Sequence, residues 1–164
     1  MIEIEQMRKD EMEELLGRLN YGHLACSNDD VPYVVPVHFA YDTPSIFIYT
    51  TEGKKAEMIR KNPRVCLQAE EVHDRRNWKS VIVNGEARQV MDLDERQRAI
   101  DLITQINPTL TPAVSIRWMD SWVRENVEVI LKITPEYKTG RATVERSDTT
   151  APFAPNVDPN PTLN

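Results

Sequence analysis

The stretch VPYVVPVHFAYDTPSIFIYTTEGKKAEMIR, residues 31–60, decides the fold of this chain. Its first part is rich in β-branched and aromatic residues, which predicts two strands, Pro32–Tyr41 and Ser45–Thr50, joined by a short turn. The second strand leads into the polar sequence TTEGKK, and a helix over Lys54–Lys61 follows and ends at Asn62-Pro63. We therefore expect a hairpin whose second strand runs directly into a helix.

The TTEGKK junction, residues 50–55, gathers groups that bind anions. It places two hydroxyls, a glycine and two lysines where a strand ends and a helix begins. Free backbone N–H groups and the positive end of the helix dipole meet at the same point. Lys54 and Lys55 are unfavourable there unless an anion compensates them, although a helix start with solvated lysines is the alternative. We interpret the junction as a phosphate clamp for a phosphorylated cofactor that lies across a sheet.

Length and composition bound the class of protein. The 164 residues suit one domain, and 40% of them are hydrophobic. The formal net charge of −6 argues against duplex nucleic acid as a partner. The apolar runs are only of strand length, so we expect no membrane span, and the acidic start MIEIEQMRKDEMEELL does not resemble a signal peptide. We expect a cytoplasmic protein.

The residues that most often carry catalysis show no recognisable arrangement. Cys26 and Cys66 each lie in an expected strand, which predicts two reduced, buried thiols. His23, His38 and His73 lack metal-ligand spacing, so we expect no metal site. The chain contains neither GxSxG nor GxGxxG. His38 is either structural or a proton donor beside a cofactor ring, because it lies on the strand next to the clamp strand.

The remaining elements follow from periodicity and turn signals. Pro36 within its strand indicates an edge or a bulge, since proline cannot donate to a ladder. Residues 112–126 are ambiguous between a helix and an irregular segment. The other expected elements are a helix Asp10–Leu19, a strand Tyr21–Ser27, a turn Asn28–Asp30, a strand Arg64–Val72, a polar loop His73–Asn77, a strand Trp78–Met91 with a bulge or turn at Asn84-Gly85, a helix to Ile106 capped by Asp92 with Glu95 as capping-box partner, and a last strand Val127–Thr134.

This order of elements predicts a mainly β (α+β) domain, a small antiparallel barrel with peripheral helices. The links between strands are too short for crossover helices, except between Asp92 and Asn126. The composition changes near Val144, where a proline-rich stretch begins. We expect a domain over residues 1–143 and a flexible tail over residues 144–164.

Three segments together carry a family resemblance: YGHLACSNDDVPYVVPVHFAYD at 21–42, IFIYTTEGKKAEMIRKNPRVCLQAEEV at 46–72, and NWKSVIVNGEARQV at 77–90. Their order resembles the pyridoxamine 5′-phosphate oxidase-like FMN-binding split-barrel family. The similarity is greatest to the branch that includes the nitroimidazole-resistance proteins, and it covers about residues 10–140.

The resemblance implies a six-stranded antiparallel split β-barrel that forms a homodimer with two FMN molecules at the subunit interface. It implies that a strand runs along the flavin ring, that a junction reaches the ring edge and the phosphate, and that a second strand also contacts the flavin. The Trp118–Trp122 segment of the partner subunit would complete the site. The cofactor-binding residues implied are Val35, Pro36, Val37, His38, Tyr49, Thr50, Lys54, Lys55, Ser80 and Val81, with Trp78 as a weaker candidate.

The resemblance also frames the function. Pyridoxamine phosphate oxidases carry an arginine where this chain has Val34, so we do not expect that oxidation here. The leading hypothesis is an FMN-dependent oxidoreductase that passes NAD(P)H-derived electrons to a small acceptor, with a nitroaromatic as one candidate and His38 as a tentative catalytic residue. The alternatives are a non-catalytic flavin- or heme-binding or sensing module, an F420-dependent reductase, and a structural dimer without a cofactor.

Overall fold

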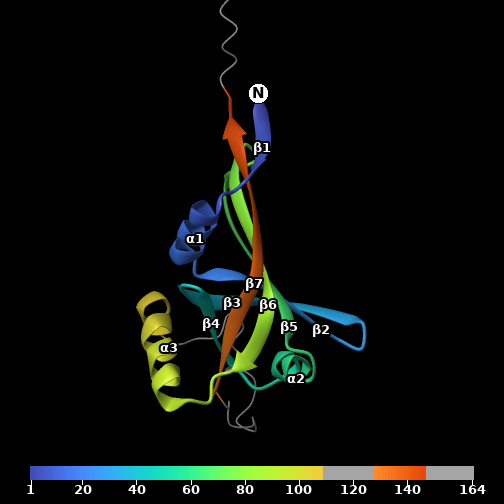
Figure 1. Cartoon of the computed structure of the whole chain (residues 1–164), viewed down its shortest axis with the longest axis vertical. Coiled ribbons are helices and arrows are strands. Elements are labelled where there is room, and N and C mark those ends of the chain that lie inside the picture. Colours follow the sequence, from blue (N-terminus) through green and yellow to red (C-terminus); the bar gives the residue numbers. More distant parts are fainter. Residues whose placement is uncertain (109–127, 147–164) are drawn as a thin grey trace, which may run out of the picture.

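The computed structural model describes residues 1–108 and 128–146. In this part of the chain a single antiparallel sheet has the strand order β1-β7-β4-β3-β2-β5-β6, and an additional β7–β6 pairing closes six of the strands into a barrel (Figure 1). The elements are β1 Ile2–Gln6, α1 Lys9–Arg18, β2 Tyr21–Asn28, β3 Val31–Asp42, β4 Ser45–Thr51, α2 Lys54–Lys61, β5 Arg64–Asp74, β6 Asn77–Gln89, α3 Leu93–Ile106 and β7 Glu128–Glu145. The predicted split barrel is confirmed, with β1 as a seventh strand.

Strand alternation fills the barrel with apolar side chains. Leu24, Phe39, Ile48, Leu67 and Val81 come from five different strands and are fully buried in one core cluster. A second cluster joins the outside of the barrel to α3; it consists of Ala40, Phe47, Val90, Ala99, Ile103 and Ile130. Burial of these apolar side chains is the main force that holds the strands in register.

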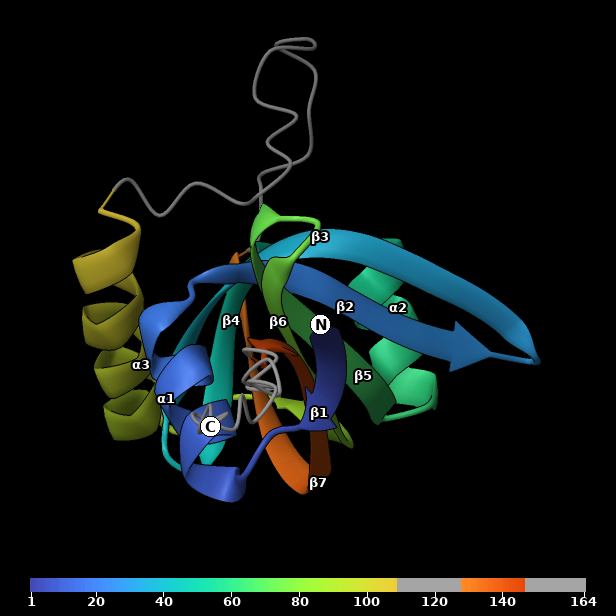
Figure 2. The same ribbon diagram turned by 90° about the horizontal axis from the view of Figure 1, so that it is seen from above.

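The β2–β3 hairpin extends beyond the barrel, and α2 lies beneath it (Figure 2). Its turn is the two-residue link Asp29–Asp30, in which both residues have positive φ, 50° and 60°. That geometry matches the twist of the flanking strands, and aspartate tolerates it. The turn predicted here is confirmed, and it fixes which residues of β2 and β3 face each other.

The outer part of β3 has a free edge. From Val31 to His38, β3 pairs with β2 on one side only, because its pairing with β4 begins at Phe39. Pro36 lies within this edge, opposite His23, so its missing N–H breaks no ladder. The edge predicted from Pro36 is therefore present.

Strands β5, β6 and β7 form a long ribbon. The β6–β7 register shifts at Asn84/Gly85, where we expected a bulge or a turn. A Cβ atom at Gly85 would lie 2.2 Å from the carbonyl oxygen of Thr134, so only glycine permits this close approach. Pro135 lies opposite Gly85 at the same irregularity. The irregular pairing accommodates the N–H that proline lacks. Strand β7 therefore continues past its expected end at Thr134.

Both ends of the chain contribute more strand than expected. Ile2–Gln6 forms β1, which pairs with Arg141–Glu145 of β7. The sequence IEIEQ does alternate, but its partner lies about 140 residues away, so no local signal identifies it. As a result β7 runs to Glu145, two residues past the boundary expected at 143/144. Of the tail expected over 144–164, residues 147–164 lie outside the described residues, as does the Trp118–Trp122 segment.

Three local predictions need correction. The expected loop His73–Asn77 is a tight turn, because β5 continues to Asp74 and β6 begins at Asn77. Asp92 caps α3 by accepting from the Glu95 N–H at 2.8 Å, but the Glu95 carboxylate pairs with Lys132 instead of completing a capping box. Cys26 is buried, whereas Cys66 is only partly buried, and both are free thiols.

Candidate functional site

The start of α2 is a helix N-terminus without a side-chain cap. Gly53 is the N-cap residue, so no side chain caps the helix. Its backbone (φ 157°, ψ −168°) lies in a region that glycine adopts readily. The first N–H groups of α2 therefore remain available at the positive end of the helix dipole. This is the junction that we interpreted from the sequence as a phosphate clamp.

The two lysines of the junction lie against the β2–β3 hairpin. The Lys54 ammonium is 4.7 Å from the ring centroid of Tyr33 on β3. Burial lowers the pKa of Lys55, and the nearby thiol of Cys26 on β2 opposes this in part. In the described part of the chain neither lysine forms a salt bridge with a carboxylate. The structure therefore holds two cations, Lys54 exposed and Lys55 partly buried, beside an uncapped helix start.

The clamp is adjacent to the strand expected to follow a cofactor ring. Tyr33, Val35 and Val37 face the interior of the hairpin and barrel, and Val37 is fully within the core. Pro36 and His38 face outward from the same strand. Because β3 is unpaired on one side here, its backbone groups are accessible along the edge, which fits contact through the backbone.

A row of polar and aromatic side chains crosses the outer face of the sheet. The Tyr21 ring meets His38 edge-on at 5.6 Å and His23 at 5.8 Å. His23 Nδ1 lies 3.4 Å from Oε1 of Gln68, and the Gln68 amide donates to the Ser80 hydroxyl at 3.3 Å. The row therefore connects the two strands that the resemblance expects to contact the flavin: β3 through His38 and β6 through Ser80.

The structure thus divides the expected site residues between two sides of the sheet. Lys54 and Lys55 lie on the inner side of the hairpin, whereas the side chains of His38 and Ser80 belong to the outer side. Two strands separate β3 from β6, which amounts to roughly 14 Å at the usual strand spacing. Val81 is fully buried, so only its backbone is available to a ligand.

Tyr49 and Thr50 present their side chains to opposite faces of β4. Tyr49 packs against the cluster beneath α3, and its hydroxyl donates to Oε2 of Glu128 at 3.3 Å. Glu128 also pairs with Arg96 of α3. Thr50 is only 3% exposed and faces the other way. The two side chains therefore cannot reach one ligand together, although the adjacent backbone can.

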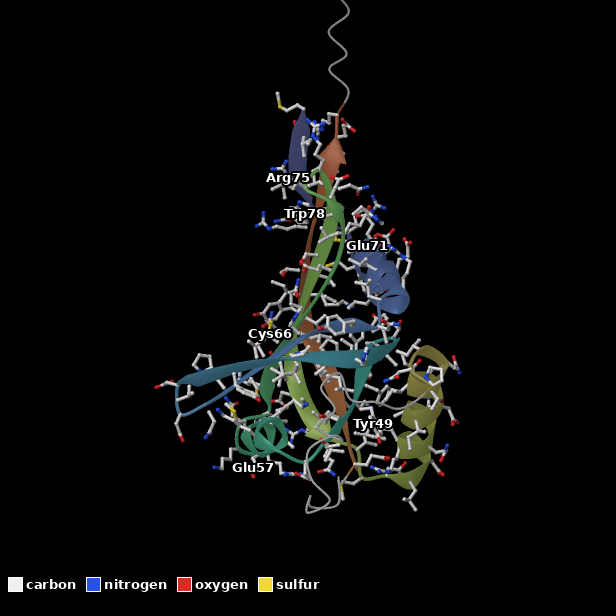
Figure 3. All side chains as sticks on the ribbon, turned by 180° about the vertical axis from the view of Figure 1, so that it is seen from behind. Tyr49, Glu57, Cys66, Glu71, Arg75 and Trp78 are labelled. Carbon is white, nitrogen blue, oxygen red and sulfur yellow. The ribbon has the colours of Figure 1, made fainter. Side chains whose placement is uncertain are left out.

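Trp78 does not join the group. It lies toward the outer end of the β5–β6 ribbon with Arg75, well away from Tyr49 (Figure 3). Its backbone N–H donates to the Thr143 hydroxyl at 3.0 Å. In the described residues no three or more His, Cys, Asp or Glu side chains are grouped to hold a metal ion. No described helix is both long and apolar enough to cross a membrane.

Sequence reasoning missed Tyr21, Tyr33 and Gln68. A signal for Tyr21 was present, since a two-residue turn at Asp29–Asp30 fixes the hairpin register and places Tyr21 opposite His38. The position of Gln68 beside His23 depends on the pairing of β2 with β5, and no local sequence pattern reveals that pairing.

Comparison with known proteins gives a consistent result. A family model described as pyridoxamine 5′-phosphate oxidase matches residues 8–142. An uncharacterized protein, RA0666, of Rhizobium meliloti is 33% identical over 84 residues, which cover 51% of this chain. The match spans 56% of the length of that relative.

Solved structures share the fold. An FAD-binding protein from Mesorhizobium loti is 29% identical, with a TM-score of 0.72, over 88% of this chain and 100% of its own. A candidate 5-nitroimidazole antibiotic resistance protein from Bacteroides thetaiotaomicron is 18% identical, with a TM-score of 0.65, over 87% of this chain and 89% of its own. At that identity the second likeness concerns the fold alone.

Proposed function

Because this chain belongs to the pyridoxamine 5′-phosphate oxidase family, we propose that it is an FMN-binding flavoprotein. The observation that carries the proposal is the uncapped start of α2, where Lys54 and Lys55 have no carboxylate partner among the described residues. The N–H groups and the two ammonium groups suit a phosphate, and the free edge of β3 beside them suits a planar ring. Val35, Pro36 and Val37 would meet that ring through their backbone.

The bound flavin would supply two-electron redox chemistry. This chain would supply the orientation of the flavin and the charge around it. Lys54 and Lys55 would fix the phosphate, and the backbone at Tyr49 and Thr50 would border the ring. His38 lies on the outward side of the ring strand and could hold or release a proton there.

We propose that the protein works as a homodimer through the outer face of the sheet. Exposed apolar side chains occupy outward positions on six strands, and exposed apolar surface commonly marks interfaces. They are Ile4 (58% exposed), Tyr21 (46%), Val34 (61%), Val72 (60%), Ile82 (38%) and Tyr137 (58%). A dimer of this form would explain why Ser80 lies on that face, since it could reach the cofactor held by the partner.

A double variant tests the dimer. Ile82→Glu with Tyr137→Glu places charges on the proposed interface and should convert the dimer to a monomer in light scattering after size exclusion. Leu93→Glu is the control, because Leu93 is 78% exposed on α3, away from this face. A dimer that survives the double variant would contradict this interface.

The phosphate clamp is tested by titrating the protein with FMN and with riboflavin, which lacks the phosphate. We expect FMN to bind about a hundredfold more tightly than riboflavin, because several charge-assisted hydrogen bonds depend on the phosphate. Lys54→Ala with Lys55→Ala should abolish that difference. Lys61→Ala, at the far end of α2, is the control. Equal affinities in the unmodified protein would refute the clamp.

The choice of FMN over FAD needs its own titration. FAD carries the same first phosphate and adds a second phosphate with an adenosine, and the Mesorhizobium loti protein of known structure is named as FAD-binding. We propose FMN, which uses the clamp fully and needs no site for adenine. Tighter binding of FAD than of FMN would replace this part of the proposal.

We further propose that the flavoprotein is an oxidoreductase that passes NAD(P)H-derived electrons to a small acceptor. The shared fold with a candidate nitroimidazole-resistance protein makes a nitroaromatic the first acceptor to test. The measurement is NAD(P)H oxidation by the FMN-loaded protein with and without the acceptor. Flavin binding without any turnover would favour the alternative of a non-catalytic binding or sensing module.

A further inference from the structure

A recess opens on the outer face of the sheet between β2 and β5. It has a volume of about 250 Å³, just below the range of about 300–1,000 Å³ that is usual for ligand pockets, so it suits a molecule with one ring. Its lining residues are Tyr21, Gly22, His23, Gln68, Glu70 and Val72.

The shape of the recess depends on the close approach of its two strands. A Cβ atom at Gly22 would lie 2.5 Å from the backbone carbonyl oxygen of Gln68. Glycine therefore lets β2 and β5 come together with His23 directly opposite Gln68. Backbone pairing between β2 and β5 thus holds the aromatic side chains of Tyr21 and His23 beside the amide of Gln68.

The polar groups of the recess are connected and carry one negative charge. The Gln68 amide donates to Oε2 of Glu70 at 3.1 Å and to the Ser80 hydroxyl at 3.3 Å. A carboxylate accepts about four hydrogen bonds, so Glu70 retains capacity after this one. The described lining includes Glu70 but neither lysine nor arginine, which favours a ligand that donates hydrogen bonds or carries a positive charge.

The walls of the recess favour an aromatic ring. The Tyr21 and His23 rings are 5.8 Å apart at an interplanar angle of 80°, so they form two sides of a corner. Val72, 60% exposed, supplies an apolar surface. A planar ring can pack edge-to-face in such a corner while its substituent reaches Glu70.

We propose that this recess binds a one-ring aromatic molecule with an amine, amidine or amide group, and that the flavoprotein reduces members of this class that also carry a nitro group, which accepts the NAD(P)H-derived electrons. The second part rests on the proposed function, because Gln68 joins the recess to Ser80 and Tyr21 joins it to His38. Those two residues belong to the strands expected to contact flavin. The substrate would lie in the shared face of the dimer, beside the cofactor of the partner.

Three probes with the same ring test the binding site: benzamidine (cationic), benzamide (neutral) and benzoate (anionic). They are titrated by calorimetry into the full-length, flavin-free protein. We expect benzamidine to bind at least about tenfold more tightly than benzoate, with benzamide between them, because hydrogen bonds to a charged group contribute about 1.5–3 kcal/mol. Equal affinities, or no binding of benzamidine, would overturn the proposal.

The variants Glu70→Gln and Glu14→Gln separate the recess from general surface charge. Glu70→Gln should reduce the preference for benzamidine to within about twofold, since its charge-assisted bond is lost. Glu14 lies exposed on α1, and its substitution should change nothing. A preference that survives Glu70→Gln would place the probe elsewhere and would contradict the proposal.

The substrate role has a separate readout. Benzamidine added to the FMN-loaded protein should shift the visible absorption of the flavin, and Glu70→Gln should abolish the shift. Binding without a shift would overturn the substrate role. If the protein fails to bind FMN but still binds benzamidine in the recess, the proposed function fails while the binding site stands.

Discussion

The helices α2 and α3 begin in opposite ways. At α3 the Asp92 side chain accepts from the Glu95 N–H, and Asp94 and Glu95 add negative charge to the first turn. At α2 the N-cap is Gly53, no side chain caps the helix, and Lys54 and Lys55 occupy the first two positions. One helix start satisfies its own dipole, while the other places two lysines at its positive end, with Glu57 as the one acidic residue of its first turn. The contrast within one chain is the one we expect if α2 binds an anion that is not part of the protein.

The helices also differ in how they attach to the sheet. Three residues of α3 pair with oppositely charged residues on β3 or β7: Glu95 with Lys132, Arg96 with Glu128, and Arg98 with Asp42. The ion pair at α2, between Arg60 and Glu52, is local. Helix α3 is thus built as a structural support, and its acidic start reflects stability rather than binding.

The largest effect is expected from giving α2 the acidic start of α3. Lys54→Asp with Lys55→Glu should weaken FMN binding by more than about a hundredfold, because two attractive charges become repulsive. The same change should stabilise the protein by about 0.3–1 kcal/mol for each reversed charge, since acids suit a helix start. FMN titration and chemical denaturation measure the two effects.

The opposite signs of those two effects are the critical result. A variant that lost both binding and stability would show that the lysines support the fold, and the contrast between the helices would lose its meaning. Lys61→Glu, in the last turn of α2, is the matched control. It should leave FMN binding nearly unchanged.

The next effect concerns the cap of α3. Asp92→Ala should lower the free energy of unfolding by about 1 kcal/mol, and Asp92→Asn should retain most of the stability because an amide oxygen also caps. FMN affinity should not change in either variant. Asp94→Ala, in the same turn but without a capping bond, should cost less. If Asp92→Ala and Asp94→Ala lowered the free energy of unfolding equally, the contribution of Asp92 would come from its charge and not from its capping hydrogen bond.

A smaller effect is expected where α3 meets the sheet. Arg96→Gln should lower the free energy of unfolding by roughly 0.5–1 kcal/mol, within the range for partly exposed ion pairs. Its partner Glu128 also accepts from the Tyr49 hydroxyl, so Tyr49→Phe should show coupling with Arg96→Gln in a double-mutant cycle. Strict additivity would show that the two contacts are independent.

The parts of this fold that could be predicted from sequence have local causes. The Asp29–Asp30 turn, the TTEGKK junction and the bulge at Gly85 each depend on residues whose backbone preferences act within a few positions. The open start of α2 is of this kind, because a glycine and two lysines identify it without any tertiary contact.

The parts that could not be predicted depend on long-range pairing. Strand β1 is defined by β7, and the row from His38 to Ser80 requires β2 to pair with β5 and β5 with β6. Tyr49 and Thr50 were expected to act together, but strand alternation sends their side chains to opposite faces of β4. The division of the site between two sides of the sheet follows from the topology, and the proposed dimer would bring both sides to one cofactor.

The smallest effect is expected from the pH dependence of Lys55. Burial lowers the pKa of Lys55 in the folded protein below its ordinary value, so the unfolded chain holds this proton more tightly. The resulting destabilisation is fully present below the folded pKa. It disappears as the pH rises through the folded pKa toward the unfolded value. The free energy of unfolding should therefore rise with pH, relative to Lys55→Met, over that interval.

FMN affinity should change in the reverse direction over the same interval, because the phosphate needs the charged lysine. It should begin to fall at a lower pH than an ordinary lysine would cause, and Lys55→Met should lack this early fall. Denaturation and FMN titration between neutral and alkaline pH measure both curves. If stability and affinity rose together, the partly buried Lys55 would not be the group that holds the phosphate, and Lys54 alone would distinguish α2 from α3.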